Sequence, residues 1–312
     1  MAQAVQAALD QQYPNLEVVV FDDCSTDATW DVLSQVVDRY RGPHKVVTHR
    51  HPQNVGPMAN TLDAVDRAGG QLIVRGHGDD ISMPDRVAKV GALWQRTGAT
   101  IISHNALKSV GLGQSAQLLR APSRTEQVSI AEMCRQSWTD QMLGATFSID
   151  RALFETFRTL DRTRVAIGGD HVLPLRAALL GGFWYLDEPL VMWRQHPGQM
   201  TRETADFKGS IHVVGETMKA LEIPPHLQRL ADVAMMRQQA DRPELAQATQ
   251  IILETVANTS IAWLLHRRTL QANGQTLDWA PRRSRPSETL TVPPKSVRQP
   301  QRWRRRSTTR SR

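Results

Sequence analysis

Cysteine is scarce in this sequence, and long apolar runs are absent. The only two cysteines among 312 residues, Cys24 and Cys134, have no CxxC spacing, which argues against a disulfide framework or a zinc ribbon and fits a reducing, cytoplasmic compartment. No run of about 18 apolar residues occurs, so we expect no transmembrane helix. The first twelve residues lack the basic and apolar regions of a signal peptide and instead predict an amphipathic helix that begins close to Met1.

The net charge of +7 comes from the C-terminal tail. Residues 281–312 contain eleven Lys and Arg and one acid, Glu288, so this tail carries +10 and leaves −3 for residues 1–280. Its Pro, Ser, Thr and Arg content predicts disorder after about residue 278. The segment Arg302–Arg312 could bind nucleic acid or anionic lipid, but a solvated tail without a partner is the favoured interpretation, and we do not expect nucleic acid as a partner.

Strand-like runs alternate with helical patterns through the first half of the chain. Val18–Phe21 is a short apolar run that follows a turn signal, and Thr29–Tyr40 places its apolar residues on one helical face. This alternation predicts βαβ units, and therefore an α/β fold with a Rossmann-like, mostly parallel sheet and helices on both faces. The other predicted elements are strands at Lys45–Thr48, Gln71–Val74 and Ala99–Ser103 and helices at Pro57–Ala68 and Pro84–Thr97.

The second half of the chain is less regular. It predicts strands at Ala145–Ile149, Phe183–Tyr185 and Leu190–Trp193, and helices at Ala152–Phe157 and His171–Leu180. Residues 206–270 predict helices interrupted at Pro224-Pro225 and near Arg242-Pro243. The part from Ile251 to Leu265 could rest on an anionic membrane, although packing on the folded domain is the preferred interpretation. We divide the chain into a domain at 1–204, a helical segment at 205–278 and a tail at 279–312.

Two acidic pairs follow predicted strands. Asp22 and Asp23 come after the first strand, where ligands bind in open α/β sheets. A turn that caps the next helix explains Asp27, but it explains the adjacent pair poorly, because neighbouring carboxylates repel without a partner. Asp79 and Asp80 follow the strand Gln71–Val74, and hard oxygen ligands there suit Mg²⁺ or Mn²⁺. A polar loop that caps a helix is the alternative for this second pair.

Two later residues are further candidates for chemistry. Asp170 lies where Gly168-Gly169-Asp170-His171 opens a helix, so it could be a general base or an N-cap. His196 follows a predicted strand, where it could contact a diphosphate or a metal, although a lone histidine is more often structural.

These segments, taken in order, resemble glycosyltransferase family 2, whose members are inverting enzymes with a GT-A fold. The resemblance covers residues 1 to about 200. The matching segments are Gln12–Asn15, Glu17–Asp27, Asn54–Pro57 with Asn60, Gly70–Ile73, Gly78–Arg86, Gly144–Thr146, Gly169-Asp170, and Asp187–Leu190 with Arg194 and His196. The family transfers a sugar from a nucleoside-diphosphate sugar to an acceptor hydroxyl, usually for cell-surface polysaccharide or lipopolysaccharide.

The resemblance implies a role for each matching residue. Asp23 would contact the nucleotide base, with Asp22 alongside. Asp79 would bind the divalent metal, Mn²⁺ or Mg²⁺, that bridges the donor diphosphate. Asp170 would be the catalytic base. Asn54, Asp80 and His196 complete the residues expected to bind the nucleotide sugar. The implied partners are the donor, a saccharide or lipid-linked acceptor and a peripheral membrane contact.

Three departures from the family pattern set further expectations. The family begins with an apolar strand ending in Pro, a small polar residue, Tyr and Asn, and we expect that strand to precede Met1. His77 stands where the first Asp of the metal motif is usual, and imidazole suits Mn²⁺ better than Mg²⁺. Gly169 replaces a common Glu. No Gln-x-x-Arg-Trp motif occurs before the tail, so processive synthesis is not expected.

Three functions therefore remain open at the level of sequence. The chain could be an active glycosyltransferase, a relative that folds without catalysing, or a nucleic-acid-binding protein that acts through its basic tail. Metal-dependent nucleotide binding separates the first from the second, and salt-sensitive binding through the tail identifies the third.

Overall fold

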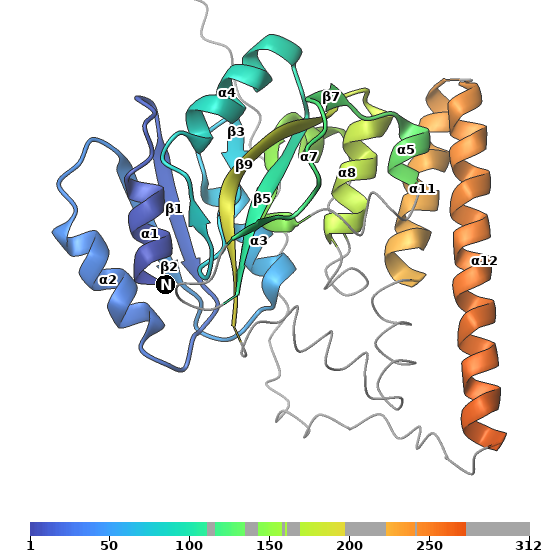
Figure 1. Ribbon diagram of the computed structural model, residues 1–312, viewed down its shortest axis with the longest axis horizontal. Helices are drawn as coiled ribbons and strands as arrows, with labels where there is room; N and C mark the ends of the chain where they lie inside the picture. The colour runs from blue at the N-terminus through green and yellow to red at the C-terminus, as the bar shows by residue number, and fades with distance from the viewer. Residues whose placement is uncertain are drawn as a thin grey trace, which may run out of the picture.

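The computed structural model describes residues 1–110, 116–134, 143–157, 160, 169–196, 223–240 and 242–272. Its N-terminal part alternates helices and strands, as the sequence predicts (Figure 1). The elements are α1 (Ala2–Leu9), β1 (Glu17–Asp22), α2 (Thr29–Arg39), β2 (Lys45–Arg50), α3 (Pro57–Arg67) and β3 (Leu72–Val74). Strands β1 and β2 form a parallel pair in register from Glu17 and Lys45 to Asp22 and Arg50.

A second, mixed sheet contains the remaining strands of the described residues. Its strand order is β3-β8-β5-β9-β4, with β6 paired to β5 and β7 paired to β9. The pairing of β5 with β9 is parallel, while β8 runs antiparallel to both β3 and β5. The bounds are β4 (Ile81–Ser82), β5 (Ile101–Val110), β6 (Gln117–Leu118), β7 (Glu126–Gln127), β8 (Ser148–Asp150) and β9 (Phe183–Gln195).

Helices cover both faces of this sheet, as predicted for an α/β fold. Neighbouring residues of β5 point to opposite faces because side chains alternate along a strand. Ile102 packs in one cluster with Val90 and Leu93 of α4 (Arg86–Thr97). Ile101 packs in the other cluster, which contains apolar residues of α3 and of α8 (Gly169–Leu179).

The C-terminal helices share that larger core. These are α11 (Ile223–Gln239) and α12 (Pro243–Ala272), and Val233 and Ile252 are both fully buried in it. A buried ion pair also joins α8 to α11: Arg176 Nε lies 2.7 Å from Asp232 Oδ2. A boundary at residue 204 therefore divides the sequence without dividing the hydrophobic core. The smaller elements of this half are α5 (Ile130–Cys134), η1 (Gly144–Thr146) and α7 (Ala152–Thr156).

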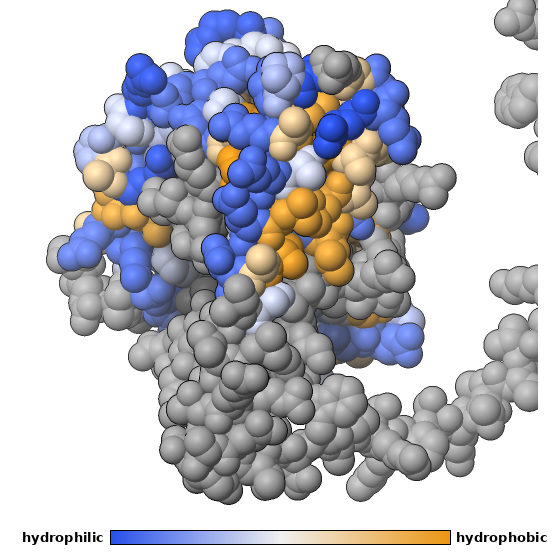
Figure 2. All heavy atoms as spheres, turned by 90° about the vertical axis from the view of Figure 1, so that its right-hand side faces the viewer, coloured by the Kyte–Doolittle hydropathy of each residue, from blue (hydrophilic) through white to orange (hydrophobic). Residues whose placement is uncertain are grey.

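The surface beside these helices is mixed in character. On the face that lies at the right in Figure 1, hydrophobic and hydrophilic residues are side by side (Figure 2). Leu227 of α11 and Leu253 of α12 are among the exposed large hydrophobic side chains. On the same helix, Ile251 and Val256 on either side of Leu253 pack against the core, which confirms the packing interpretation for that part of the helix.

Several boundaries differ from the prediction. Phe183–Tyr185 and Leu190–Trp193 belong to one strand, β9, because parallel pairing with β5 continues across a register shift near Asn105 that absorbs Asp187 and Glu188. Pro224 and Pro225 lie in the first turn of α11, where proline is compatible with a helix. The sheet is also mixed, since short strands enter it antiparallel.

The described residues also bear on the cysteines and on membrane crossing. Both cysteines are free. Among the described helices, none combines the length and the apolar character that crossing a bilayer would need. The predicted helical residues 206–222 and the basic tail lie outside the described residues.

Candidate functional site

The loop that follows β3 gathers three possible metal ligands. One ligand atom from each of His77, Asp79 and Asp80 lies within 4.8 Å of the other two. The side chain of Asp80 is only 5% exposed, whereas those of Asp79 and His77 are partly open to solvent. Burial and the neighbouring charge of Asp79 together raise the pKa of Asp80 to about 6. The electrostatic repulsion between these two neighbouring carboxylates is therefore unfavourable, and a bound cation would remove that repulsion.

The imidazole of His77 adds a nitrogen donor to this group. Its Nδ1 lies 3.7 Å from Asp80 Oδ2. Desolvation lowers the pKa of His77 to about 4, with a further contribution from the nearby Arg75 cation. The ring is therefore neutral at physiological pH and retains a lone pair for a metal ion.

The C-terminal end of β9 closes this loop from the other side. The backbone N–H of Arg194 donates to Asp80 Oδ1 at 3.1 Å, and its guanidinium donates to the carbonyl of Asp79. His196 Nε2 lies 3.3 Å from Asp79 Oδ2. Strand pairing between β4 and β9 brings these segments together, although more than a hundred residues separate them.

Asp170 reaches the same place from the first turn of α8. Its Oδ1 lies 2.8 Å from Arg75 Nη1, and its negative charge and that of Asp79 both act on His77. Gly144 makes room for this carboxylate, because a Cβ at that position would lie 2.4 Å from Asp170 Oδ2. The carboxylate is 39% exposed, so a ligand can reach it.

Asp22 and Asp23 are held in a different way. Asp22 is buried and accepts hydrogen bonds from the backbone N–H of Ser25, at 3.1 Å, and from its hydroxyl. Arg50 Nε lies 3.3 Å from the same carboxylate. Cys24 lies in the turn between Asp22 and Ser25. Its positive φ of 59° is uncommon for residues other than glycine and marks a tight turn. The carboxylate of Asp22 therefore stabilises the turn after β1.

Asp23 fastens the loop before α3. Its two carboxylate oxygens accept the backbone N–H groups of Val55 at 2.6 Å and Gly56 at 2.9 Å. Gly56 has a φ of 88°, which a residue with a Cβ rarely adopts. Asn54 Nδ2 donates to the Asp23 carbonyl at 3.2 Å. Asp27 accepts from the backbone N–H of Thr29 at 2.9 Å, which confirms a role at the start of the helix.

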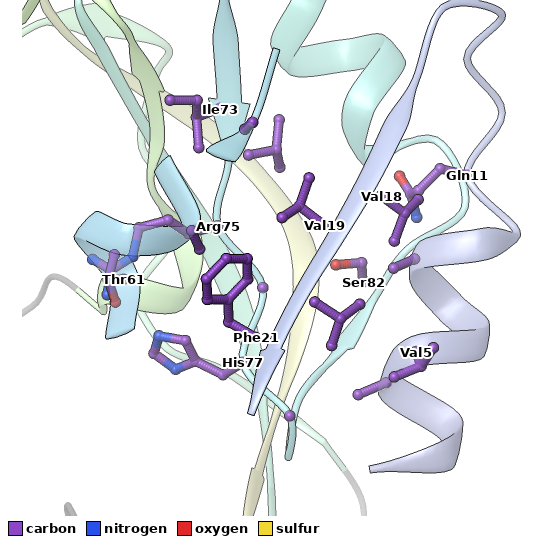
Figure 3. A pocket seen from close by; sticks show the side chains of 18 of the residues that line it. Val5, Gln11, Val18, Val19, Phe21, Thr61, Ile73, Arg75, His77 and Ser82 are labelled. Carbon is purple, nitrogen blue, oxygen red and sulfur yellow. The ribbon is translucent and has the colours of Figure 1, made fainter. Parts of the chain in front are cut away.

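The predicted site residues thus form two groups. His77, Asp79, Asp80 and His196 lie together with Asp170 close by, while Asp22, Asp23 and Asn54 form a second group at the end of β1. One cavity is lined by His77 of the first group and by Phe21, which directly precedes Asp22 of the second group in β1 (Figure 3).

Arg75 is a site residue that the sequence analysis did not single out. It follows β3 directly, lies largely buried and pairs with Asp170. Its position between an apolar strand and Gly76 is the only sequence signal that could have found it. A cation beside carboxylates at a strand end suits a negatively charged ligand.

The donor set of the loop fits a divalent metal. Oxygen from two carboxylates and nitrogen from a neutral imidazole are ligands that Mn²⁺ accepts readily, and Mg²⁺ favours the two carboxylates. The strained proximity of Asp79 and Asp80 is the structural observation that supports this fit.

Residues 1–154 match the family described as Glycosyl transferase family 2. These residues make up just under half of the chain and are similar to members of that family. The chain is 28% identical over 113 residues to EpsE from Bacillus subtilis (strain 168), which carries the name of a glycosyltransferase. It is 26% identical over 190 residues to the succinoglycan biosynthesis protein ExoO from Rhizobium meliloti (strain 1021). These alignments cover 36% and 58% of this chain, and 37% and 53% of the relatives.

A solved structure supports the fold of this chain. Residues 1–349 of TarS from S. aureus superpose with a TM-score of 0.51 and 16% sequence identity, covering 88% of this chain and 83% of that one. The likeness shows that the two chains share a fold, and it confirms the GT-A expectation.

Proposed function

We propose that this chain is a metal-dependent, inverting glycosyltransferase that moves a sugar from a nucleoside-diphosphate sugar to an acceptor hydroxyl. The observation that carries the proposal is the convergence of His77, Asp79 and Asp80 at the end of β3, with His196 and Asp170 beside them. The name of ExoO, a succinoglycan biosynthesis protein, supports a product in cell-surface polysaccharide or lipopolysaccharide synthesis.

Asp79, with His77 and Asp80, would hold Mn²⁺ or Mg²⁺. When bound, the metal supplies positive charge for the diphosphate leaving group. His196 lies against Asp79 and would support the diphosphate side of the site. Arg75 adds a second positive charge within reach of the same ligand.

Asp170 would act as the general base. It would take the proton of the acceptor hydroxyl while that oxygen attacks the anomeric carbon, and the bond from that carbon to the diphosphate would break with its electron pair leaving on the phosphate. One displacement of this kind inverts the anomeric centre. The ion pair with Arg75 orients the carboxylate, and a bound diphosphate would compete for that cation.

Asp22, Asp23 and Asn54 would hold the nucleotide. Asp23 shapes this region through the loop Val55-Gly56, and its carboxylate oxygens keep further lone pairs for a base N–H. The acceptor would be a saccharide or a lipid-linked saccharide, which would bring the protein to the inner face of a membrane.

The experiment is a binding titration with UDP, TDP and GDP, with and without Mn²⁺, followed by an assay of sugar transfer. We expect Mn²⁺ to strengthen binding of one diphosphate, and NMR of the product to show inversion. Asp170→Asn should lower transfer by about 10²–10⁴-fold while Mn²⁺-dependent nucleotide binding persists. Gly144→Ala, which crowds the Asp170 carboxylate, should also lower transfer without affecting the metal.

Asp66→Asn, an exposed change on α3, is the matched control. The proposal would be refuted if nucleotide binding stayed unchanged both when Mn²⁺ is chelated and when Asp79 is removed.

A second function is favoured by one observation. The Asp170 carboxylate is paired with Arg75, which stabilises its charged form and weakens it as a base. A relative that binds nucleotide without catalysing transfer would show metal-dependent binding and no product. In such a relative, Arg75→Gln would still give no sugar transfer. In an active enzyme, the same substitution should change the rate of transfer.

A further inference from the structure

A buried arginine lies behind the proposed metal ligands. Arg86 begins α4, and its exposed fraction is 1%. Its side chain donates only to neutral partners among the described residues: Nη1 to the Ser82 hydroxyl at 2.9 Å, and Nη2 to the Ala145 carbonyl at 2.6 Å. Its Nε has no hydrogen-bond partner in the described part of the chain. Burial of a cation without a hydrogen-bonded carboxylate is unfavourable, so packing alone does not account for an arginine here.

The side chain of Arg86 stays charged at neutral pH. Burial lowers the pKa of its guanidinium to about 9, and the negative charge of Asp80 opposes that shift. Desolvation, with a further contribution from the Arg86 cation, lowers the pKa of the buried His104 on β5 well below its usual range, so this ring is neutral and does not compensate the guanidinium. The two hydrogen bonds from Arg86 are therefore charge-assisted, and such bonds are stronger than neutral ones.

The bond from Nη1 reaches the segment that carries the metal ligands. We call residues 77–80 the metal loop. Ser82 lies in β4, two residues after Asp80. Strand β4 pairs with β9, whose Arg194 donates its backbone N–H to Asp80 at 3.1 Å. Arg86 therefore binds the strand that directly continues the metal loop.

The bond from Nη2 reaches the residues around Asp170. Ala145 lies in η1, and the preceding Gly144 makes the room that the Asp170 carboxylate occupies. Phe147, directly after η1, accepts the backbone N–H of Arg75 at 3.0 Å. We call residues 144–147 the base seat, because they contact both Asp170 and its ion-pair partner Arg75.

We propose that Arg86 is a positioning residue whose guanidinium joins the metal loop to the base seat and so fixes the distance between the metal and Asp170. This inference rests on the proposed function, in which the metal holds the donor and Asp170 deprotonates the acceptor. A guanidinium presents several N–H donors in one rigid plane, whereas a lysine ammonium is a compact charge on a flexible stem. Lysine in place of Arg86 would keep the charge without keeping both bonds in that geometry.

Arg229 offers a matched control for this substitution. It is also buried, with 2% exposed, and its Nη2 donates to the Met133 carbonyl at 3.0 Å. Its Nε, like that of Arg86, has no hydrogen-bond partner within the part of the chain that the structure describes. This contact joins α11 to α5, and neither helix carries a proposed site residue. Arg229→Lys therefore makes the same chemical change at a similar depth, away from the site.

Amide hydrogen exchange tests the joint in the absence of metal and substrate. Arg86→Lys should speed exchange in residues 79–82 and 144–147 by at least about tenfold, because each segment can then open without the bond that joins it to the other. Arg229→Lys should speed exchange near Met133 and leave both of those segments unchanged. Unchanged exchange in either segment of the Arg86→Lys variant would overturn the inference.

Steady-state kinetics separates positioning from a merely structural role. Arg86→Lys should lower kcat by about 10–100-fold, because a displacement of about 1 Å between reacting groups can have an effect of that size. The KM for the donor and the affinity for Mn²⁺ should stay nearly unchanged, because the ligands themselves remain. Arg229→Lys should preserve kcat even where it lowers the unfolding temperature as much. Equal losses of kcat in the two variants, or a loss in Arg86→Lys that saturating Mn²⁺ reverses, would overturn the inference.

Ser82→Ala provides a second variant in case Arg86→Lys does not fold. It removes the acceptor of Nη1 alone, so it should lower kcat in the same direction by a smaller factor and retain Mn²⁺ affinity. A kcat equal to that of the unmodified chain would contradict the inference. If the unmodified chain transfers no sugar, the proposed function fails, whereas hydrogen exchange still decides whether Arg86 joins the two segments.

Discussion

One Asp-Asp pair lies at the end of β1 and another in the loop after β3, and the two pairs have different surroundings. Asp22 and Asp23 accept hydrogen bonds from Ser25, Val55 and Gly56, so their charges are compensated locally. Asp79 and Asp80 repel each other beside a neutral imidazole, and the pKa of Asp80 is raised. Identical residues at equivalent sheet positions thus stabilise a turn in one case and prepare a cation site in the other. The difference comes from the donors within reach: Asp22 also has the Ser25 hydroxyl and the Arg50 guanidinium, and Asp23 has two backbone N–H groups.

Loss of Asp79 should have the largest effect on function. Asp79→Ala removes a proposed metal ligand. Changes to residues that only hydrogen-bond to metal ligands cost about 10–100-fold in metal affinity, so we expect at least about 100-fold weaker Mn²⁺ binding. Calorimetry with Mn²⁺ measures this. Asp23→Ala is the matched variant from the other pair, and an equal loss of Mn²⁺ affinity in both would erase the contrast between them.

Loss of Asp23 should have the larger effect on stability. Asp23→Ala leaves the N–H groups of Val55 and Gly56 without their charged acceptor, and hydrogen bonds to charged groups contribute about 1.5–3 kcal/mol. We expect thermal unfolding to shift downward by several degrees. A midpoint equal to that of the unmodified chain would show that this carboxylate does not hold the loop.

Asp80→Asn should act in the opposite direction in the absence of metal. The amide keeps an oxygen to accept the Arg194 N–H while removing a buried charge beside Asp79. With EDTA present, we expect unfolding to shift upward, by up to about 1 kcal/mol in free energy. With Mn²⁺ present, the unmodified chain should gain stability that the variant does not. A downward shift in EDTA would mean that Asp80 is compensated as Asp22 is.

Of these changes, removal of the basic tail should have the smallest effect on metal binding and on nucleotide binding at the two acidic pairs. Deleting residues 281–312 takes away +10 of charge, but leaves the proposed metal ligands in place. Mn²⁺ affinity and nucleotide binding should stay within about twofold, since the contact residues remain. Salt-sensitive binding to DNA that disappears with the tail, without any nucleotide binding before the deletion, would favour a nucleic-acid-binding protein instead.

Local sequence was enough to find most elements and the chemistry-bearing loops. Apolar periodicity placed α2, α3 and β1 within about two residues of their observed bounds, because their core faces are continuous along the chain. It divided β9 into two strands, because pairing with β5 across an irregular register is a long-range property. Arg75 escaped notice for the same reason, since its partner Asp170 lies 95 residues away.

The sequence by itself determined the α/β class, the order of the elements and the candidates Asp79, Asp170 and His196, because periodicity and strand-end position are local properties. Only the tertiary structure decided which carboxylates are compensated. That outcome depends on backbone N–H groups contributed by distant loops, such as Val55-Gly56 for Asp23. The cavity between β1 and the end of β3 is likewise visible only in three dimensions, because the residues that line it come from segments far apart in the sequence.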